Sequence, residues 1–405
     1  MRIALISDIH FGRSAVNNEF SFRGESLELA ETKNAKPLFA GMVEILKPAR
    51  PDFLFVAGDL TSSGNPLEFK YCHEKIAELA KSIGVGADNI IFCIGNHDLD
   101  WRISDIKSKY PDTYIEEDVE YINQFYQKLS YSVPDIIGLS STMPSTVCDR
   151  YEIPITYIAE YEECVIFVLN SSHKSARDQK YKHGCLTTQQ LDWFMKAAKE
   201  YKDSDKKKVL LLHHHPFNYP YPLPELDIST LEEGAEIVKI CGENGVDLVI
   251  HGHRHQPQAK THYENGWMKP VTFICSGSIA VNVNGRQHGI PNTFHLIDFK
   301  SPSSICLKNY SYSAIEGWKP STNSITTPVD GEMLLGKVIS PETAERIVSE
   351  LPHNVDIPYN SLSVDLHYWP AYKLMGLIKR VHGDCTVYGE FPGNIFIFEG
   401  AKAND

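Results

Sequence analysis

The sequence contains no Cys-x-x-Cys pair and no long apolar run, and it has a deficit of positive charge. Its nine cysteines are scattered singly, and Cys93, Cys164 and Cys275 sit inside apolar runs. This pattern favours buried reduced thiols over a disulfide framework or a thiolate zinc site. No stretch approaches the ~18 apolar residues of a membrane helix, and the opening apolar run is too short for a signal sequence. We therefore expect a cytoplasmic protein without a membrane partner.

The charge balance is acidic. Lys plus Arg total 39 against 52 for Asp plus Glu, which gives a formal net charge of -13. Such a surface repels a polyanion unless a local basic groove overrides the total, so nucleic acid is possible but disfavoured as a partner. The 405 residues, 42% of them hydrophobic, predict one large domain with an appendage or two domains.

Short apolar runs, each followed by polar residues, recur along the chain. Ile90 to Ile94 is continuously apolar, which predicts a strand buried on both faces, and Gly95 ends it. The carboxyl ends of such strands are where α/β enzymes carry their chemistry. Five runs of this kind lead into the motifs Asp8-Ile9-His10, Gly58-Asp59, Gly95-Asn96-His97-Asp98, His213-His214-His215-Pro216 and Gly252-His253-Arg254-His255.

The side chains of these motifs are nitrogen and oxygen donors of the hard-to-borderline class. Asp, Asn and His together suit divalent Mn, Fe, Zn or Co. Because no thiolate is among them, a structural zinc site is disfavoured. The size of the set divides naturally between two metal ions that share one carboxylate.

The rest of the chain predicts the supporting architecture. Helical spacing is visible at 25–48 and 66–82, and Thr187 with Gln190 offers a capping box for a further helix. Residues 100–163 read as an insertion that could wall a cleft. A Ser/Thr/Pro-rich stretch at 317–331 predicts a linker. Residues 332–405 then predict a small α/β domain without recognisable chemistry, which we expect to cover the site or to mediate homo-oligomer or partner contacts.

The five motifs in this order resemble the signature of the calcineurin-like metallophosphoesterase superfamily, over about residues 1 to 300. The resemblance implies a four-layer α/β/β/α sandwich as the catalytic domain, residues 1–316, followed by the linker and the small C-terminal α/β domain. Three further segments are similar to the class III cyclic-nucleotide phosphodiesterases, namely Leu169-Asn170-Ser171, Gly184-x-Leu186 and Gln190-Leu191-Asp192-Trp193.

Carried over residue by residue, the resemblance implies a ligand set. One ion is held by Asp8, His10 and His255, the other by Asn96, His214 and His253, and Asp59 bridges them. His214 is preferred over its neighbours because the family pattern is His-x-Pro and Pro216 sets the register. Manganese is the favoured metal. A metal-bridging hydroxide would attack phosphorus, while His97 protonates the leaving oxygen and Asp98 fixes the tautomer of His97.

The function expected on this basis is hydrolysis of a phosphodiester, such as a cyclic nucleotide or another small diester. Three alternatives stay open. A metal-dependent nuclease would bind single-stranded DNA in a salt-dependent way. A phosphomonoesterase or protein phosphatase would prefer monoesters. A non-catalytic scaffold would bind a partner and show no turnover when loaded with metal.

Overall fold

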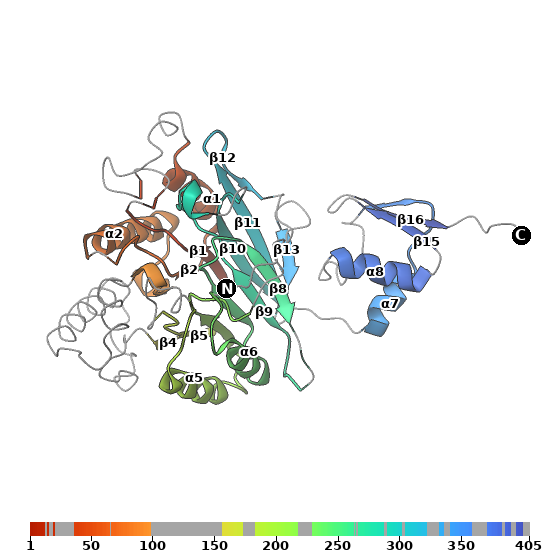
Figure 1. The fold of residues 1–405 in the computed structure, drawn as a ribbon, viewed down its shortest axis with the longest axis horizontal. Coiled ribbons are helices and arrows are strands. Elements are labelled where there is room, and N and C mark those ends of the chain that lie inside the picture. The colour runs from red at the N-terminus through yellow and green to blue at the C-terminus, as the bar shows by residue number, and fades with distance from the viewer. Residues whose placement is uncertain are drawn as a thin grey trace, which may run out of the picture.

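Two β-sheets, one of seven strands and one of six, form the centre of the larger part of the molecule (Figure 1). The computed structural model describes residues 1–12, 14–15, 19–20, 36–64, 66–98, 156–172, 183–217, 229–262, 264, 266–286, 290–301, 304–321, 332–335, 341–358, 371–382, 385–389 and 394–399. Most of the predicted insertion at 100–163, and the predicted helical segment before residue 36, lie outside the described residues.

The seven-stranded sheet has the order β12-β11-β10-β1-β2-β3, and β13 also pairs with β11. β1, β2 and β3 are parallel, so their carboxyl ends lie at one edge, whereas β10 runs antiparallel to β1. The strands are β1 (Arg2–Ile6), β2 (Phe53–Ala57), β3 (Ile90–Cys93), β10 (Asn292–Ser301), β11 (Ser304–Ser313), β12 (Gly317–Pro320) and β13 (Glu332–Leu335).

The six-stranded sheet has the order β4-β5-β6-β7-β9-β8. Its central strands β5, β6, β7 and β9 are parallel, and β4 and β8 close the two edges in antiparallel fashion. The strands are β4 (Tyr157–Glu160), β5 (Cys164–Val168), β6 (Lys207–Leu211), β7 (Leu248–His251), β8 (Gln258–His262) and β9 (Val271–Cys275).

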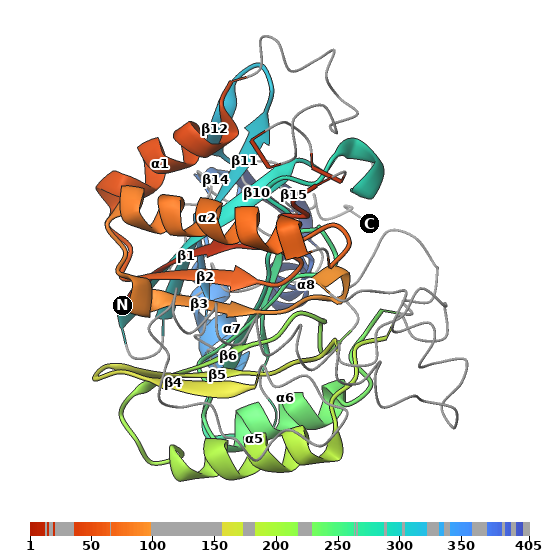
Figure 2. The ribbon, with the colours of Figure 1, turned by 90° about the vertical axis from the view of Figure 1, so that its left-hand side faces the viewer.

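Helices cover the outer face of each sheet and complete four layers (Figure 2). α1 (Leu38–Ala49) and α2 (Pro66–Ile83) pack on the first sheet, and α5 (Thr188–Glu200) and α6 (Gly234–Glu243) on the second. The predicted capping box at the start of α5 is confirmed, because the side chain of Thr187 accepts from the backbone of Gln190 and that of Gln190 accepts from Thr187. The predicted α/β/β/α sandwich is therefore confirmed.

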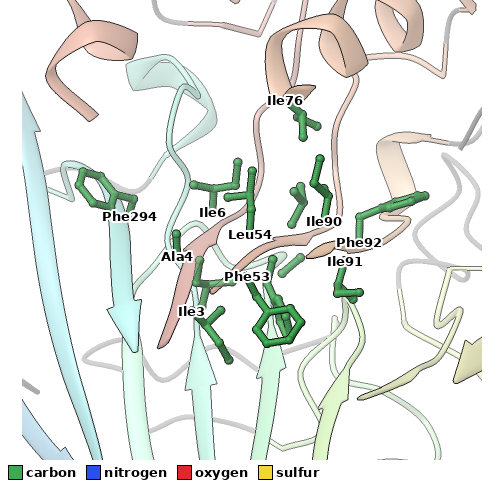
Figure 3. Close-up of a cluster of buried hydrophobic side chains, with 14 of the residues drawn as sticks. Ile3, Ala4, Ile6, Phe53, Leu54, Ile76, Ile90, Ile91, Phe92 and Phe294 are labelled. Carbon is green, nitrogen blue, oxygen red and sulfur yellow. The ribbon is translucent and has the colours of Figure 1, made fainter. Parts of the chain in front are cut away.

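The two-residue period of the strands assigns their side chains to separate layers. In β5, Cys164, Ile166 and Val168 join the core between the sheets, while Val165 and Phe167 join the core under α5 and α6. Figure 3 shows the same division in the first sheet, with Leu54 on the side facing Ile76 of α2 and Phe53 on the opposite side. Because both faces are buried, these strands read as unbroken apolar runs.

A third sheet, of three strands, and two helices lie between residues 341 and 399. The sheet has the order β14-β16-β15, and α7 packs against α8. The elements are α7 (Pro341–Ser349), β14 (Asp356–Pro358), α8 (Ala371–His382), β15 (Cys385–Gly389) and β16 (Asn394–Glu399). At the predicted linker, residues 317–320 are strand β12 and pair with β11, so the first sheet extends into that range. The domain division and the role of the C-terminal unit stay predictions.

The structure bears on two expectations from the composition, which concern the cysteines and membrane-spanning helices. The described cysteines Cys72, Cys93, Cys164, Cys185, Cys241, Cys275 and Cys306 are free and buried. Among the helices that the structure describes, none combines the length and the apolar character needed to cross a bilayer.

Candidate metal centre

The sequence motifs converge at the carboxyl ends of parallel strands from both sheets. Asp8, Asp59 and His253 each stand two residues beyond the last residue of their strand, β1, β2 and β7 respectively. Asn96 lies in a short 3-10 turn, η3 (Asn96–Asp98), which follows β3 after two residues. All of these strand ends face the same region because the strands are parallel within each sheet and the two sheets pack together.

The backbone at these residues adopts an uncommon conformation. Five of the predicted ligands have positive φ, namely Asp8 (50°), His10 (47°), Asp59 (52°), His253 (73°) and His255 (51°). The left-handed region is unfavourable for residues that carry a Cβ and is retained mainly where the surrounding structure imposes it, often at functional sites. The strand ends are thus bent so that their polar side chains turn toward one another.

Four predicted ligands form a first group. Nε2 of His10 lies 3.2 Å from Oδ2 of Asp59 and 3.1 Å from Nε2 of His255, and Nε2 of His255 lies 3.2 Å from Oδ1 of Asp8. One donor atom from each of these four residues lies within 4.8 Å of the others. Asp8, His10 and Asp59 are at most 2% exposed.

A second group shares Asp59 with the first. Oδ2 of Asp59 lies 3.4 Å from Nε2 of His213, which in turn lies 3.2 Å from Oδ1 of Asn96. That same Asn96 oxygen lies 2.9 Å from Nδ1 of His253. The single oxygen Oδ2 of Asp59 therefore contacts one histidine of each group, His10 on one side and His213 on the other.

The tautomers of two histidines show that these groups suit cations. Nδ1 of His213 lies 2.8 Å from the carbonyl of Ala57, and Nδ1 of His255 contacts the carbonyl of Gly285. A carbonyl only accepts hydrogen bonds, so each Nδ1 carries a proton, and Nε2, which faces the carboxylates, is the nitrogen that can hold either a second proton or a metal ion. Either cation between Nε2 and a carboxylate stabilises this arrangement, and the nitrogen and oxygen set fits a divalent metal.

Electrostatics at the shared carboxylate point the same way. Burial opposes ionisation of Asp59, but His213, His97 and His10 hold its pKa well below the usual range. Burial likewise acts to lower the pKa of His213, yet the Asp59 carboxylate raises that pKa to about 9. Positive charge beside Asp59 is thus favoured, as protons on histidine in the metal-free protein or as metal ions that replace those protons.

The structure places His213 beside Asp59 and Asn96, while the ring centroid of the predicted ligand His214 lies 4.4 Å from that of His253. His213 follows β6 by two residues, the same interval as at Asp8, Asp59 and His253. The His214 ring instead has Nδ1 3.0 Å from the hydroxyl of Ser171, and its Nε2 is buried without a hydrogen-bond partner among the described residues. Counting two residues back from Pro216, as the His-x-Pro pattern does, gives His214. Counting two residues forward from the end of β6 gives His213.

The two predicted catalytic residues have different surroundings. Nδ1 of His97 lies 3.2 Å from the carbonyl of Ser62, and its backbone N–H donates to Oδ1 of Asp59 at 2.8 Å. The Asp98 carboxylate accepts from the backbone of Gly95 at 2.8 Å and from the backbone and hydroxyl of Thr61 at 2.9 and 3.1 Å. The Ser62 carbonyl therefore helps to orient the His97 ring, and the Asp98 carboxylate holds the neighbouring turns together.

Several supporting residues carry little signal in the sequence. Ser7 donates to the Asp8 carboxylate and to the carbonyl of Ala57, and Gly285 provides a carbonyl to His255 from about 30 residues downstream. Ser62 reaches His97 through a backbone carbonyl, which any residue type could supply. Only the placement of Ser7 directly before Asp8 could have suggested a role from the sequence.

Gly95 leaves space for the shared carboxylate. A Cβ at Gly95 would lie 2.1 Å from Oδ1 of Asp59, whereas a Cβ at Gly86 would meet nothing within 4 Å. We expect Gly95→Ala to displace Asp59 and to weaken metal binding by about 10-fold to 100-fold, the usual effect of disturbing the support of a ligand. Metal titration monitored by calorimetry would measure the change.

Gly86→Ala is the matched control for this substitution and should bind metal like the wild-type protein. Unchanged metal affinity in Gly95→Ala would mean that Asp59 moves aside without cost, or that it holds no metal.

Three comparisons relate the chain to known proteins. A family model described as calcineurin-like phosphoesterase matches residues 1–257. A protein of a Synechococcus strain, named a probable cyclic nucleotide phosphodiesterase, is 25% identical over 259 residues, which cover 63% of this chain and 74% of that protein.

Solved structures are also similar. A purple acid phosphatase from yellow lupin matches with a TM-score of 0.47 and 13% identity, over 78% of this chain and 52% of that one, so this chain spans about half of its length. A dimetal phosphatase from Danio rerio matches with a TM-score of 0.45 and 11% identity, over 80% of this chain and 99% of that one.

Proposed function

Because the chain belongs to the calcineurin-like phosphoesterase family, we propose that it is a two-metal phosphodiesterase that hydrolyses a cyclic nucleotide or another small phosphodiester. The family implies a hydrolase of phosphate esters. The preference for diesters is supported by the probable cyclic nucleotide phosphodiesterase that resembles residues of this chain at 25% identity.

The observation that carries the proposal is the shared oxygen of Asp59. Two groups of nitrogen and oxygen donors meet at Oδ2, which lies 3.2 Å from Nε2 of His10 and 3.4 Å from Nε2 of His213. Two divalent ions held in this way would supply water activation at neutral pH and charge neutralisation on a phosphoryl group. A single-metal site would not need a carboxylate between two sets of ligands.

We assign the ligands from the geometry. Asp8, His10, Asp59 and His255 hold one ion, and Asp59, Asn96, His213 and His253 hold the other. This proposal keeps every predicted ligand except His214, which His213 replaces. Manganese stays the favoured metal, although the same donors also accept Fe, Zn or Co.

His97 is the proposed proton donor to the leaving oxygen. Because its Nδ1 lies 3.2 Å from the Ser62 carbonyl, Nδ1 keeps its proton in both charge states and Nε2 is the nitrogen that exchanges one. Burial lowers the pKa of His97 to about 4, although Asp59 acts in the opposite direction. A bound phosphoester anion would favour the protonated ring and so prepare it to donate.

The test is hydrolysis of bis(p-nitrophenyl) phosphate and p-nitrophenyl phosphate by the full chain, first stripped with a chelator and then reloaded with Mn²⁺. We expect diester turnover that disappears with the chelator and returns with the metal, because the ions supply the activated water. A screen of cyclic nucleotides would then narrow the substrate.

Other outcomes would favour the alternatives. Faster turnover of the monoester would favour a phosphomonoesterase or protein phosphatase. Cleavage of single-stranded DNA, with binding that weakens as salt increases, would favour a nuclease. If the protein binds two ions but hydrolyses none of these esters, the result would contradict the proposal and favour a scaffold.

A further inference from the structure

Glu68 is a buried carboxylate outside both ligand groups. It lies in the first turn of α2 and is 7% exposed. Its Oε2 accepts from the backbone N–H of Ser62 at 3.2 Å, and from the backbone N–H and the hydroxyl of Ser63 at 3.0 Å each. Its other oxygen packs closely against Gly12, where a Cβ would lie 2.6 Å away. A buried carboxylate is costly unless it is hydrogen-bonded, so these donors fix its position and it fixes theirs.

The turn that Glu68 holds is the one that contacts His97. Residues 61–64 connect Asp59 to α2, and the carbonyl of Ser62 lies 3.2 Å from Nδ1 of His97. On the other side of the turn, the hydroxyl of Thr61 donates to the carbonyl of His97 at 3.0 Å. The ring and the backbone of His97 are therefore both held by this turn.

The hydroxyl of Ser62 connects the same turn to the backbone of the proposed ligand His10. It donates to the carbonyl of His10 at 2.6 Å and accepts from the backbone N–H of Ser14 at 3.2 Å. The side chain of Ser62 is thus occupied with the loop after β1. The carbonyl of Ser62 shares its peptide group with the backbone N–H of Ser63, which donates to Glu68 at 3.0 Å, so Glu68 sets the direction of that carbonyl. The backbone N–H of Ser62 is shared between Glu68 at 3.2 Å and the carbonyl of Phe11 at 3.0 Å.

We propose that Glu68 is a positioning residue for His97, acting through the Ser62–Ser63 turn to hold Nδ1 as the fixed donor and Nε2 as the nitrogen that protonates the leaving oxygen. This inference rests on the proposed function. In the reaction, a P–O bond to the water oxygen forms, the P–O bond to the leaving group breaks, and the proton of Nε2 goes to the leaving oxygen. A misaligned ring would deliver that proton poorly.

The dependence on the leaving group separates this role from a structural one. A good leaving group such as p-nitrophenolate departs with little help from an acid, whereas phenolate needs the proton. Glu68 also stands where a negative charge stabilises the first turn of a helix. Loss of that stabilisation alone would slow both substrates equally.

The experiment compares diphenyl phosphate with bis(p-nitrophenyl) phosphate for Glu68→Ala, His97→Ala and the double variant, all loaded with Mn²⁺. We expect Glu68→Ala to lower kcat on diphenyl phosphate by about 10-fold to 100-fold, the usual size for a residue that orients another, with little change in KM. Turnover of bis(p-nitrophenyl) phosphate should change little. In the His97→Ala background, Glu68→Ala should cause no further loss, because both residues act as one unit.

Two further variants complete the test. Glu78→Ala is the matched control, since Glu78 lies on the same helix, is exposed, and its side chain pairs with half-buried Lys75 among the described contacts. If Glu68→Ala does not fold, Glu68→Asp takes its place, because it keeps the charge but withdraws the carboxylate by one methylene. Equal losses on both esters, or an additional loss in the His97→Ala background, would overturn the inference while leaving the proposed function intact. A wild-type protein that hydrolyses neither ester would instead contradict the proposed function.

Discussion

Asp59→Asn should lose the binding of both metal ions and nearly all turnover. The substitution keeps the shape of the side chain but removes the charge of Oδ2, which lies 3.2 Å from Nε2 of His10 and 3.4 Å from Nε2 of His213. Charge stabilisation by bound metal is worth several kcal/mol, and about 1.4 kcal/mol corresponds to a factor of ten, so we expect a loss on the order of 10³ in kcat. Elemental analysis and diester hydrolysis would measure both effects.

Asp52→Asn is a suitable control, because Asp52 directly precedes the same strand but lies at its opposite end. Its carboxylate accepts from the backbone N–H of Arg2 at 2.7 Å and is largely exposed, so metal content and turnover should be unchanged. An Asp59→Asn protein that keeps two ions and stays within tenfold of wild-type turnover would contradict the shared-ligand arrangement.

His213→Ala should remove one metal ion per chain, whereas His214→Ala should leave both in place. The reason is geometric. Nε2 of His213 lies 3.2 Å from Oδ1 of Asn96 and faces Asp59, while the His214 ring has Nδ1 3.0 Å from the hydroxyl of Ser171. We expect turnover in His213→Ala to fall on the order of 10²-fold to 10³-fold, as for the loss of several kcal/mol of charge stabilisation.

These two variants are matched controls for each other. Both remove the same fully buried ring at adjacent positions, so the cost of the cavity should be of similar size, about 2 to 5 kcal/mol for large side chains. Thermal unfolding would check that both proteins are folded before metal is counted. If His214→Ala lost the ion and His213→Ala kept it, His214 would be the ligand, as the His-x-Pro pattern predicts.

Much of the fold could be predicted from the sequence because it depends on local patterns. The run before Gly95 reads as a strand buried on both faces, and it is β3 in the structure. Thr187 and Gln190 form the capping box that their spacing predicts. The start of β12 at Gly317 was not predictable, because its four residues lack an apolar period and are strand only through pairing with β11.

Some contacts of the candidate site could likewise be predicted from the sequence, and others could not. Asp8, His10 and His255 meet Asp59 as the resemblance implies, because each lies within four residues of the end of β1 or β7, whose direction the fold determines. Asp98, by contrast, was expected to orient His97, and its carboxylate instead accepts from Gly95 and Thr61. The orienting contact comes from a backbone carbonyl at Ser62, and residue type carries no information about where a carbonyl points.

By itself, the sequence predicted the buried strands and the chemical type of the ligands, because apolar runs and the donor atoms of each side chain are local properties. The four-layer arrangement and the place of Asp59 between two groups were implied by the resemblance of the five motifs to the metallophosphoesterase signature. Only the tertiary structure decided which of three consecutive histidines faces Asp59. It also decided that Ser62 contacts His97 and that Glu68 contacts the turn of Ser62. Beyond the end of a strand, the direction of a side chain depends on backbone dihedrals imposed by packing between distant loops, and neighbouring histidines are chemically identical until that packing is complete.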